Sequence, residues 1–377
     1  MRAIRVHRFG GPEALVAEEI DTPTPGPGQA LVRVEAAGVN YLDINQRNGS
    51  YPGALPFTPG LEAAGVVAAV GPDVADVRVG DRVAYAAAQP GAYAEAAVWP
   101  VDKLVPIPEG VTAEQAAAAL FQGLTAHYLT RSAYAVQPGD HILVHAAAGG
   151  VGLLLVRMAK RRGAWVAGVV STEEKAAQAR EAGADEIILS RGVDIAAEVR
   201  RLTGGEGVHA VYDSVGRATF AASLDALRRR GTLVLFGQAS GPVPALDPGV
   251  LGAKGSLTLT RPVLFDYTVT REELLWRAGE VLGGVRGRHA DVAHRPPLLA
   301  QRGRRGPCAI GEPRFKRQSP ADPLAIVLLI LKRQEIRVER MDKPMTAPCT
   351  HLNQIQDVTP SAQGCEDCLT GSTCASA

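Results

Sequence analysis

Strand-like and helix-like patterns alternate through the middle of the chain. Between residues 141 and 237, short β-branched and aliphatic runs are followed by stretches in which apolar residues recur every three or four positions. The strand candidates are 142–145, 165–170, 186–189, 210–212 and 232–236, with 256–260 as a further strand. The helix candidates are 151–162, 173–181, 195–202 and 219–229. Repeated strand–helix units at this spacing predict an α/β fold with a doubly wound parallel sheet.

The first 110 residues follow a different pattern, in which short apolar runs alternate with turns rich in proline and glycine. The runs at 30–34, 65–70 and 82–84 are separated by such turns. This spacing predicts a small β-rich barrel or sandwich. Between the two regions, Thr112 and Gln115 form a capping-box pattern at the start of an alanine-rich helix over 112–131.

A glycine-rich stretch, HAAAGGVG at 145–152, follows the first strand of the α/β region. Gly149 and Gly150 have no Cβ atoms that would block a pyrophosphate, and Gly152 lets the next helix pack close to its strand. Phosphates would then bind free N–H groups at the helix N-terminus, among them that of Val151. Such a pattern also occurs in plain tight turns, but the strand before it and the helix after it favour dinucleotide binding.

Composition narrows the class of protein. The chain has 377 residues, 46% of them hydrophobic and 21% charged, which is enough for two globular domains. The formal net charge of +1 gives no electrostatic case for binding nucleic acid or a membrane surface. No apolar run reaches the ~18 residues of a membrane span, and the first residues lack a signal-peptide pattern, so we expect a cytoplasmic protein. All five cysteines lie at or after Cys308.

Seven motifs in a fixed order carry a family resemblance. They are AGVNYLD at 37–43, PGLEAAGVV at 59–67, VGDRVAY at 79–85, GLTAHYL at 123–129, HAAAGGVG at 145–152, VYDSVG at 211–216 and WRAGEVL at 276–282. Over residues 1–283 the chain resembles the zeta-crystallin-type quinone oxidoreductases of the medium-chain dehydrogenase/reductase superfamily. The resemblance implies a GroES-like β-rich catalytic domain, a Rossmann domain, NADPH as cofactor, quinone as substrate, and a homodimer.

The pattern and the resemblance together predict the domain organisation. Residues 1–122 form the GroES-like catalytic domain, 123–262 the Rossmann NADPH-binding domain, and 263–284 the start of a return to the catalytic domain. Residues 285–348 are expected to be irregular and disordered, because 286–317 are rich in arginine and show no periodicity. Residues 349–377 are expected to be a truncated zinc-finger-like remnant.

The same resemblance predicts a site without catalytic zinc. Zinc-dependent relatives place a cysteine and a histidine on the metal, where this chain has Asn40 and Leu61. No four-cysteine lobe occurs near 86–100. Zinc needs three or four nitrogen or sulfur ligands, and the first 307 residues cannot supply that set.

The cofactor preference rests on the end of the second Rossmann strand. An acidic residue at this place would bind the ribose 2′-hydroxyl of NAD, but the chain has neutral Ser171 there. Lys175, in the first turn of the next helix, can pair with a 2′-phosphate, although it can also be a plain surface lysine. Ser190 stands where relatives often carry a tyrosine near this phosphate. We therefore expect NADPH rather than NADH.

Candidate residues for catalysis and the nicotinamide follow from the motifs. Asn40 and Tyr51 are the proposed catalytic polar groups, with Tyr41 and Asp43 as second choices. Tyr51 can alternatively shape a turn, and Thr125, which resembles a nicotinamide contact, can alternatively bond to its own helix. Residues at the carboxyl ends of strands complete the cofactor site: Ser214, Val215, Phe236, Gly237 and Gln238. The four histidines beside apolar segments are expected to be structural: His127, His141, His145 and His209.

The end of the chain resembles a different protein. Cys349, His351, Cys365 and Cys368 have metal-ligand character and resemble the opening of a ubiquitin-protease-type zinc finger. The resemblance to the quinone oxidoreductases ends near residue 283, and the resemblance to a zinc finger begins at residue 349. This change indicates a reading-frame shift and fusion, with a genuine extension as the alternative.

Three functions remain open at this point. The first is NADPH-dependent quinone reduction, and the second is NADPH-dependent reduction of activated carbon–carbon double bonds. The third is a non-catalytic NADPH-binding protein that is inactivated by its altered C-terminus, with RNA binding as a further idea. The basic stretch 286–317 gives the third little support, because Phe315 is its only aromatic residue for base stacking.

Overall fold

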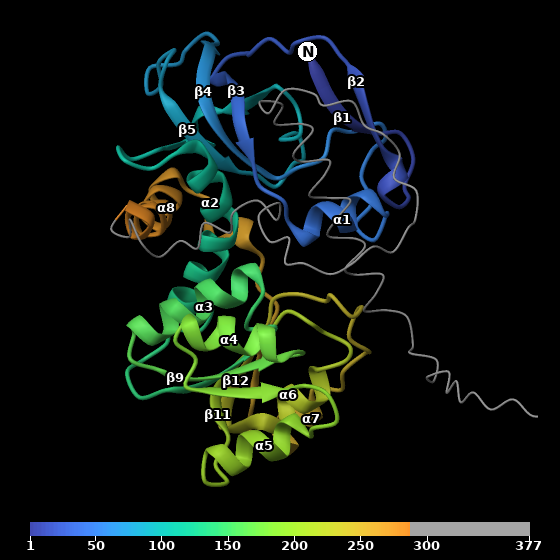
Figure 1. Ribbon diagram of the computed structural model, residues 1–377, viewed down its shortest axis with the longest axis vertical. Helices are drawn as coiled ribbons and strands as arrows, with labels where there is room; N and C mark the ends of the chain where they lie inside the picture. The colour runs from blue at the N-terminus through green and yellow to red at the C-terminus, as the bar shows by residue number, and fades with distance from the viewer. Residues whose placement is uncertain (287–377) are drawn as a thin grey trace, which may run out of the picture. The chain divides into compact units, whose positions relative to one another are not determined.

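The computed structural model describes residues 1–286 (Figure 1). A β-rich region comes first and an α/β region second, and helix α2 (Ala113–Tyr128) connects them along the chain. The sequence predictions for residues 287–377, including the four possible metal ligands of the tail, lie outside the described residues. Within residues 1–286, no helix combines the length and the apolar character needed to span a membrane.

The β-rich region contains two antiparallel sheets. A hairpin of β1 (Arg2–Val6) and β2 (Leu15–Glu19) forms one of them. The other has the order β6-β3-β4-β5-β7. Its strands are β3 (Gln29–Ala37), β4 (Glu62–Val70), β5 (Arg82–Ala86), β6 (Ala96–Pro100) and β7 (Val105–Pro106). The short helix α1 (Tyr41–Arg47) follows β3, and the apolar faces close over a core in which the rings of Tyr85 and Trp99 lie 4.6 Å apart.

Helix α2 begins as the sequence predicts. The Thr112 hydroxyl accepts a hydrogen bond from the Gln115 N–H, and the Gln115 side chain accepts one from the Thr112 N–H. The helix is buried along most of its length against the β-rich sheet and against α3 (Gly150–Arg161). The predicted domain boundary between residues 122 and 123 therefore falls inside one continuous helix.

The α/β region is a six-stranded parallel sheet, as predicted. Its order is β10-β9-β8-β11-β12-β13, which becomes 3-2-1-4-5-6 when the strands are numbered along the chain. The strands are β8 (His141–His145), β9 (Trp165–Val170), β10 (Glu186–Leu189), β11 (Val208–Asp213), β12 (Leu227–Leu235) and β13 (Thr258–Thr260). The crossover helices after α3 are α4 (Glu173–Glu181), α5 (Ile195–Leu202), α6 (Phe220–Ala226) and α7 (Gly249–Ala253). Apolar residues point to both faces of the sheet because helices cover both.

The prediction of a helix over 219–229 was wrong at its end. Helix α6 ends at Ala226, and Leu227 already pairs with Val208 as the first residue of β12. The Arg200 guanidinium donates hydrogen bonds to the carbonyls of Asp225 and Leu227, which satisfies backbone groups at the end of the helix. Helical pattern alone could not reveal this, since the strand pairing comes from residues distant in sequence.

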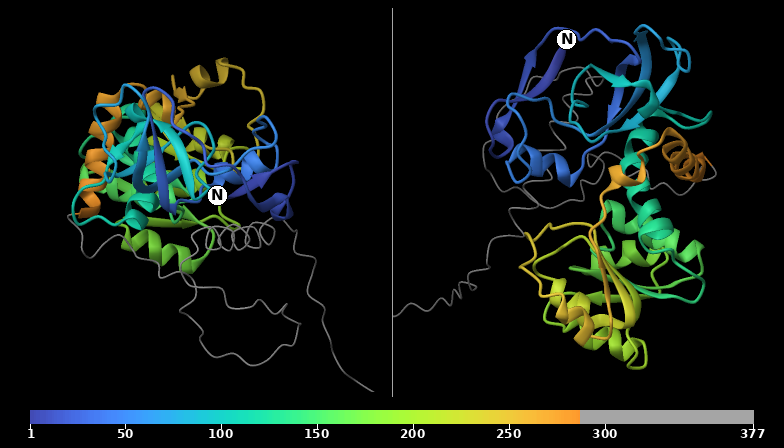
Figure 2. Two further views of the ribbon diagram at one scale, coloured as in Figure 1. Left: turned by 90° about the horizontal axis from the view of Figure 1, so that it is seen from above. Right: turned by 180° about the vertical axis from the view of Figure 1, so that it is seen from behind.

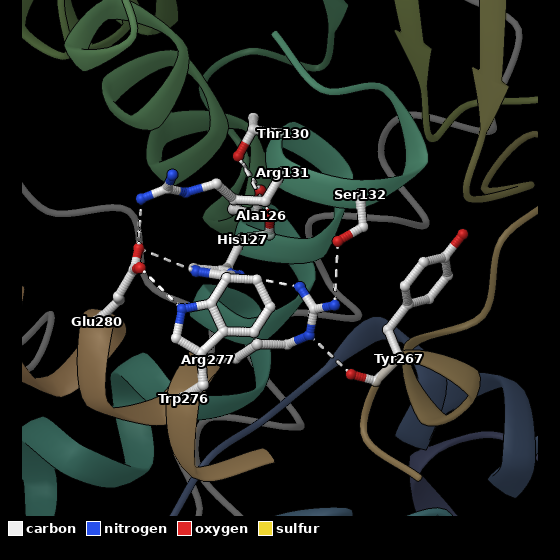
Figure 3. Close-up of polar contacts among 9 residues, drawn as sticks. All are labelled: Ala126, His127, Thr130, Arg131, Ser132, Tyr267, Trp276, Arg277 and Glu280. Carbon is white, nitrogen blue, oxygen red and sulfur yellow. Dashed lines mark hydrogen bonds and ion pairs between the residues drawn. The ribbon is translucent and has the colours of Figure 1, made fainter. Parts of the chain in front are cut away.

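Helix α8 (Arg271–Arg286) lies beside α2 (Figures 1 and 2) and is attached through a buried arginine (Figure 3). The Arg277 side chain is 1% exposed and donates to the Tyr267 carbonyl, the Ser132 hydroxyl and His127 Nδ1. Because a guanidinium can only donate, Nδ1 of His127 must accept, and the ring carries its proton on Nε2. Nε2 then donates to Glu280 at 3.1 Å. His127 is thus the structural histidine that the sequence predicts.

Helix α8 also contacts the β-rich region. The Arg271 guanidinium donates to the carbonyls of Val101 and Leu104, and Lys103 Nζ donates to the Val269 carbonyl just before the helix. Residues Val269 and Arg271 therefore contact the segment 101–104 of the β-rich region.

Candidate cofactor site and catalytic pocket

The sheet order marks where a ligand would bind. The two chain directions diverge between β8 and β11, and open α/β sheets bind ligands at the carboxyl ends of the strands at such a switch point. The glycine loop 146–149 follows β8, and the turn 214–216 follows β11. The glycine loop and the turn 214–216 therefore follow the two neighbouring parallel strands at this switch point.

The glycine loop is shaped to bring backbone close to a ligand. Ala146 has a φ of +50°, and its carbonyl accepts a hydrogen bond from the Gly149 N–H at 2.8 Å. A Cβ atom on Gly152 would lie 2.3 Å from the Ala146 oxygen, so only glycine lets α3 start this close to the loop. The first N–H groups of a helix have no partners within the helix and are available to phosphate oxygens. This cradle fits a dinucleotide diphosphate.

Gln122, which the sequence reasoning did not single out, connects the glycine loop with the catalytic region. A Cβ atom on Gly150 would lie 2.0 Å from Gln122 Oε1, so the amide of Gln122 sits directly against the start of α3. Gln122 Nε2 also donates to Asn40 Oδ1 at 3.4 Å. The position before the 123–129 motif was the only available sequence signal.

Asn40 lies in a buried polar network. Its side chain is 6% exposed, and Nδ2 donates to Glu62 Oε1 at 2.8 Å. Glu62 Oε2 accepts the Phe121 N–H from α2 at 2.8 Å. On the other side, the Asp43 carboxylate accepts the Asn40 N–H and the Tyr93 hydroxyl, each at 2.7 Å. In this network the amide nitrogen of Asn40 faces Glu62 and its amide oxygen faces Gln122.

Burial shifts the acidity of both carboxyl groups in this network. It raises the pKa of Glu62 to about 8 and the pKa of Asp43 to about 6, against the opposing effect of their hydrogen bonds. A Cβ atom on Gly38 would lie 2.1 Å from Glu62 Oε1, so that glycine makes room for the carboxyl group. An uncharged Glu62 near neutral pH fits its fully enclosed position.

Three other predicted residues differ in exposure. Tyr41 and Tyr51 are 43% and 36% exposed, and Thr125 is 8% exposed. The Tyr41 hydroxyl donates to the Ala239 carbonyl at 3.4 Å, which joins α1 to the loop after β12. The Thr125 hydroxyl donates to the Phe121 carbonyl of its own helix at 2.8 Å, so only its oxygen lone pairs remain for a nicotinamide contact.

The predicted 2′-phosphate residues gather at the ends of β9 and β10. Lys175 Nζ lies 3.0 Å from Ser171 Oγ, and Ser190 bonds through its N–H to the Val170 carbonyl at 2.9 Å. Ser190 is exposed, whereas Ser171 and Lys175 are half-buried. A cationic group beside a neutral hydroxyl suits a phosphate ester, and Glu173 and Glu174 are the acidic residues in the same first turn of α4.

The loops after β11 and β12 interlock. A Cβ atom on Gly237 would lie 2.5 Å from the Ser214 carbonyl oxygen, and the N–H of Phe236 donates to the Asp213 carbonyl at 2.8 Å. Ser240 closes the contact, because its N–H donates to the Val215 carbonyl at 2.8 Å. The half-buried residues of these two loops are the ones proposed for the cofactor site: Ser214, Val215, Phe236, Gly237 and Gln238.

No metal site is evident in the part of the chain that the structure describes. Across residues 1–286, no three His, Cys, Asp or Glu side chains come together in a group that could hold a metal ion. Asn40 is bound to Glu62, and Leu61 is fully buried.

Comparisons with known proteins agree with this architecture. The alcohol dehydrogenase GroES-like domain family matches residues 26–109, and the zinc-binding dehydrogenase family matches residues 150–274. The quinone oxidoreductase of Salmonella typhimurium is 46% identical over 279 residues, which cover 74% of this chain and 85% of that protein. The 2-haloacrylate reductase of a Burkholderia species is 43% identical over 278 residues, covering 71% of this chain and 83% of that protein.

A solved relative contains the expected cofactor. The crystal structure of the Escherichia coli quinone oxidoreductase complexed with NADPH is 43% identical and has a TM-score of 0.74. The match covers 76% of this chain and 88% of that one. The predicted combination of a GroES-like domain with a Rossmann sheet is confirmed.

Proposed function

Since the chain belongs to the quinone oxidoreductase family of the medium-chain dehydrogenase/reductase superfamily, we propose that it reduces quinones with NADPH and without a metal. The single observation that carries this proposal is the switch point of the parallel sheet, between the carboxyl ends of β8 and β11. There the glycine loop, the turn 214–216 and the interlocked residues 236–238 occur together.

The residues of this chain would bind and orient the reactants. Bound NADPH supplies hydride from its nicotinamide, so the protein need not provide a strong acid or a metal. The start of α3 would hold the diphosphate, Ser171 and Lys175 the 2′-phosphate, and the residues of 214–216 and 236–238 the nicotinamide half. Asn40 and Tyr51 are the proposed polar groups facing the quinone, with Asn40 held in place by Glu62 and Gln122.

A second enzyme activity has a specific argument in its favour. The Burkholderia relative at 43% identity is a 2-haloacrylate reductase, which supports reduction of an activated carbon–carbon double bond. Both reactions need hydride delivery to an electron-poor acceptor, and the same crevice could serve either.

Steady-state kinetics separate these functions. We expect the full chain to oxidise NADPH with a naphthoquinone at a kcat/KM at least about tenfold above that with 2-chloroacrylate. The reverse order would support the second activity. NADPH binding without turnover of either substrate would instead support a non-catalytic NADPH-binding protein.

We also propose that the protein is a cytoplasmic homodimer. Within residues 1–286, β13 is an end strand of the sheet and pairs with β12 on one side. Unpaired strand edges favour association with a second strand. Light scattering after size exclusion is expected to give twice the mass of one chain, and a monomeric mass would contradict the proposal.

A further inference from the structure

A buried chain of three side chains links the two loops of the crevice. His145 is the last residue of β8, Asp213 the last of β11, and Ser223 lies on α6. All three are at most 1% exposed. Ser223 Oγ lies 2.8 Å from Asp213 Oδ2 and 3.0 Å from His145 Nε2.

The hydrogen bonds of Asp213 fix the direction of the whole chain. Its carboxylate accepts the N–H groups of Val215 at 2.8 Å and Gly216 at 3.0 Å, and the Thr219 hydroxyl at 2.7 Å. Each of these groups acts as the donor, and the Asp213 carboxyl oxygens accept. The single hydroxyl proton of Ser223 must therefore go to Asp213 as well.

The protonation of His145 follows from this arrangement. Because the Ser223 hydroxyl donates its hydrogen bond to Asp213, the Ser223 oxygen can only accept a hydrogen bond from His145. The His145 ring must therefore carry a proton on Nε2. Burial lowers the pKa of His145, which agrees with a neutral ring. Nδ1 is then an unprotonated acceptor that is buried and has no hydrogen-bond partner among the described residues. A buried acceptor without a hydrogen-bond partner lowers the stability of the fold. A functional role for the His145 ring would explain why this residue occurs here.

We propose that Asp213, Ser223 and His145 are positioning residues for the cofactor. Together they hold the turn 214–216 and the start of the glycine loop at a fixed spacing before NADPH binds. This inference rests on the proposed NADPH binding. The Asp213 carboxylate shapes the turn through the N–H groups of Val215 and Gly216, and His145 is bonded covalently to Ala146, the first residue of the loop. A binding site assembled in advance avoids the entropy cost of ordering its loops.

The test is the affinity of the full chain for NADPH, measured by fluorescence titration without substrate. Ser223→Ala removes the hydroxyl that joins His145 to Asp213, and we expect the Kd of NADPH to rise about tenfold. At saturating NADPH, the quinone KM is expected to stay within about twofold, because these three residues are not placed against the quinone.

A matched control comes from the same domain. Thr203, 9% exposed, donates to the Val199 carbonyl and accepts the Gly207 N–H, away from both loops. Thr203→Val also removes one buried hydroxyl, and we expect it to lower stability while leaving the NADPH Kd unchanged. If Ser223→Ala and Thr203→Val shift the Kd equally, or neither shifts it, the positioning role is wrong.

A second readout does not depend on the cofactor. Nitrogen-15 NMR of labelled histidines is expected to show His145 neutral with its proton on Nε2, and Ser223→Ala is expected to change that signal. A His145 ring with its proton on Nδ1 would overturn the inference. Unchanged NADPH affinity in Ser223→Ala with normal quinone turnover would refute the positioning role and leave the proposed function standing. Failure of the unmodified chain to bind NADPH would refute both.

Discussion

At the scale of single residues, Lys175 is the group that should distinguish the two nicotinamide cofactors. Its ammonium lies beside neutral Ser171 at the end of β9. We expect Lys175→Ala to raise the KM for NADPH about tenfold, through loss of a charge-assisted hydrogen bond to the 2′-phosphate, and to leave the KM for NADH nearly unchanged. Lys103→Ala, which removes a surface lysine bonded to the Val269 carbonyl, serves as the control. Equal changes for both cofactors would contradict the assignment.

Gly152 is the residue on which the shape of the glycine loop depends. A Cβ atom there would meet the Ala146 oxygen at 2.3 Å, and that oxygen belongs to backbone that cannot rotate away. We expect Gly152→Ala to lower the free energy of unfolding by about 1–3 kcal/mol and to weaken NADPH binding at least about tenfold.

The control for Gly152 is Gly279 in the middle of α8, where a Cβ atom would meet nothing within 4 Å. Gly279→Ala is expected to stabilise the protein by about 0.5–1 kcal/mol, because alanine loses less backbone entropy than glycine in a helix. Urea unfolding measures both changes. Similar NADPH affinity in the two variants would show that the loop tolerates a side chain at residue 152.

At the scale of elements, the attachment of α8 to α2 depends on Arg277 (Figure 3). Its buried guanidinium bonds to Tyr267, His127 and Ser132 and forms an ion pair with Glu273. Arg277→Ala leaves the acceptors on Tyr267, His127 and Ser132 without their donor, and we expect a loss of roughly 1–3 kcal/mol in the free energy of unfolding.

Arg201 provides the comparison for Arg277. It forms an exposed ion pair with Glu198 on α5, and water and salt screen such a pair strongly. Arg201→Ala should therefore change urea unfolding little. A small effect of Arg277→Ala would mean that apolar packing alone holds α8, for example where Val281 lies against Gly123.

At the scale of the whole molecule, the buried carboxyl groups predict how stability depends on pH. Folding raises the pKa of Glu62 to about 8 and that of Asp43 to about 6. The folded chain therefore binds more protons than the unfolded chain in this range, and its stability falls as pH rises. The contribution of Glu62 is fully present below about pH 4.5 and is lost as pH passes about 8.

Urea unfolding between about pH 7 and 9 checks this, because unperturbed histidines have lost most of their charge by pH 7. We expect the free energy of unfolding to decrease across this interval in the unmodified chain and to change less in Glu62→Gln. Glu198→Gln, at an exposed carboxylate whose pKa is lowered by Arg201, should keep the original slope. A slope that Glu62→Gln leaves intact would assign the pH dependence to other groups.

The sequence by itself determined the α/β region, the β-rich region and the helix between them. Their signals are local: the spacing of apolar residues, the capping pair Thr112 and Gln115, and the glycines beside a strand. The ordered motifs determined the family for the same reason, since each is a short contiguous stretch. The loops that form the crevice could be predicted because they follow strands whose carboxyl ends share one edge of a parallel sheet.

Only the tertiary structure decided which distant groups meet. The end of α6 depends on the pairing of Leu227 with Val208. The position of the Asn40 side chain depends on its hydrogen bonds with Glu62 and Gln122, and the proton position on His145 depends on Ser223. Each of these contacts joins residues that are well separated along the chain. A glutamate, a glutamine or a histidine in a linear pattern does not reveal its partner, because hydrogen bonding and burial are set by packing between elements rather than by neighbours in sequence.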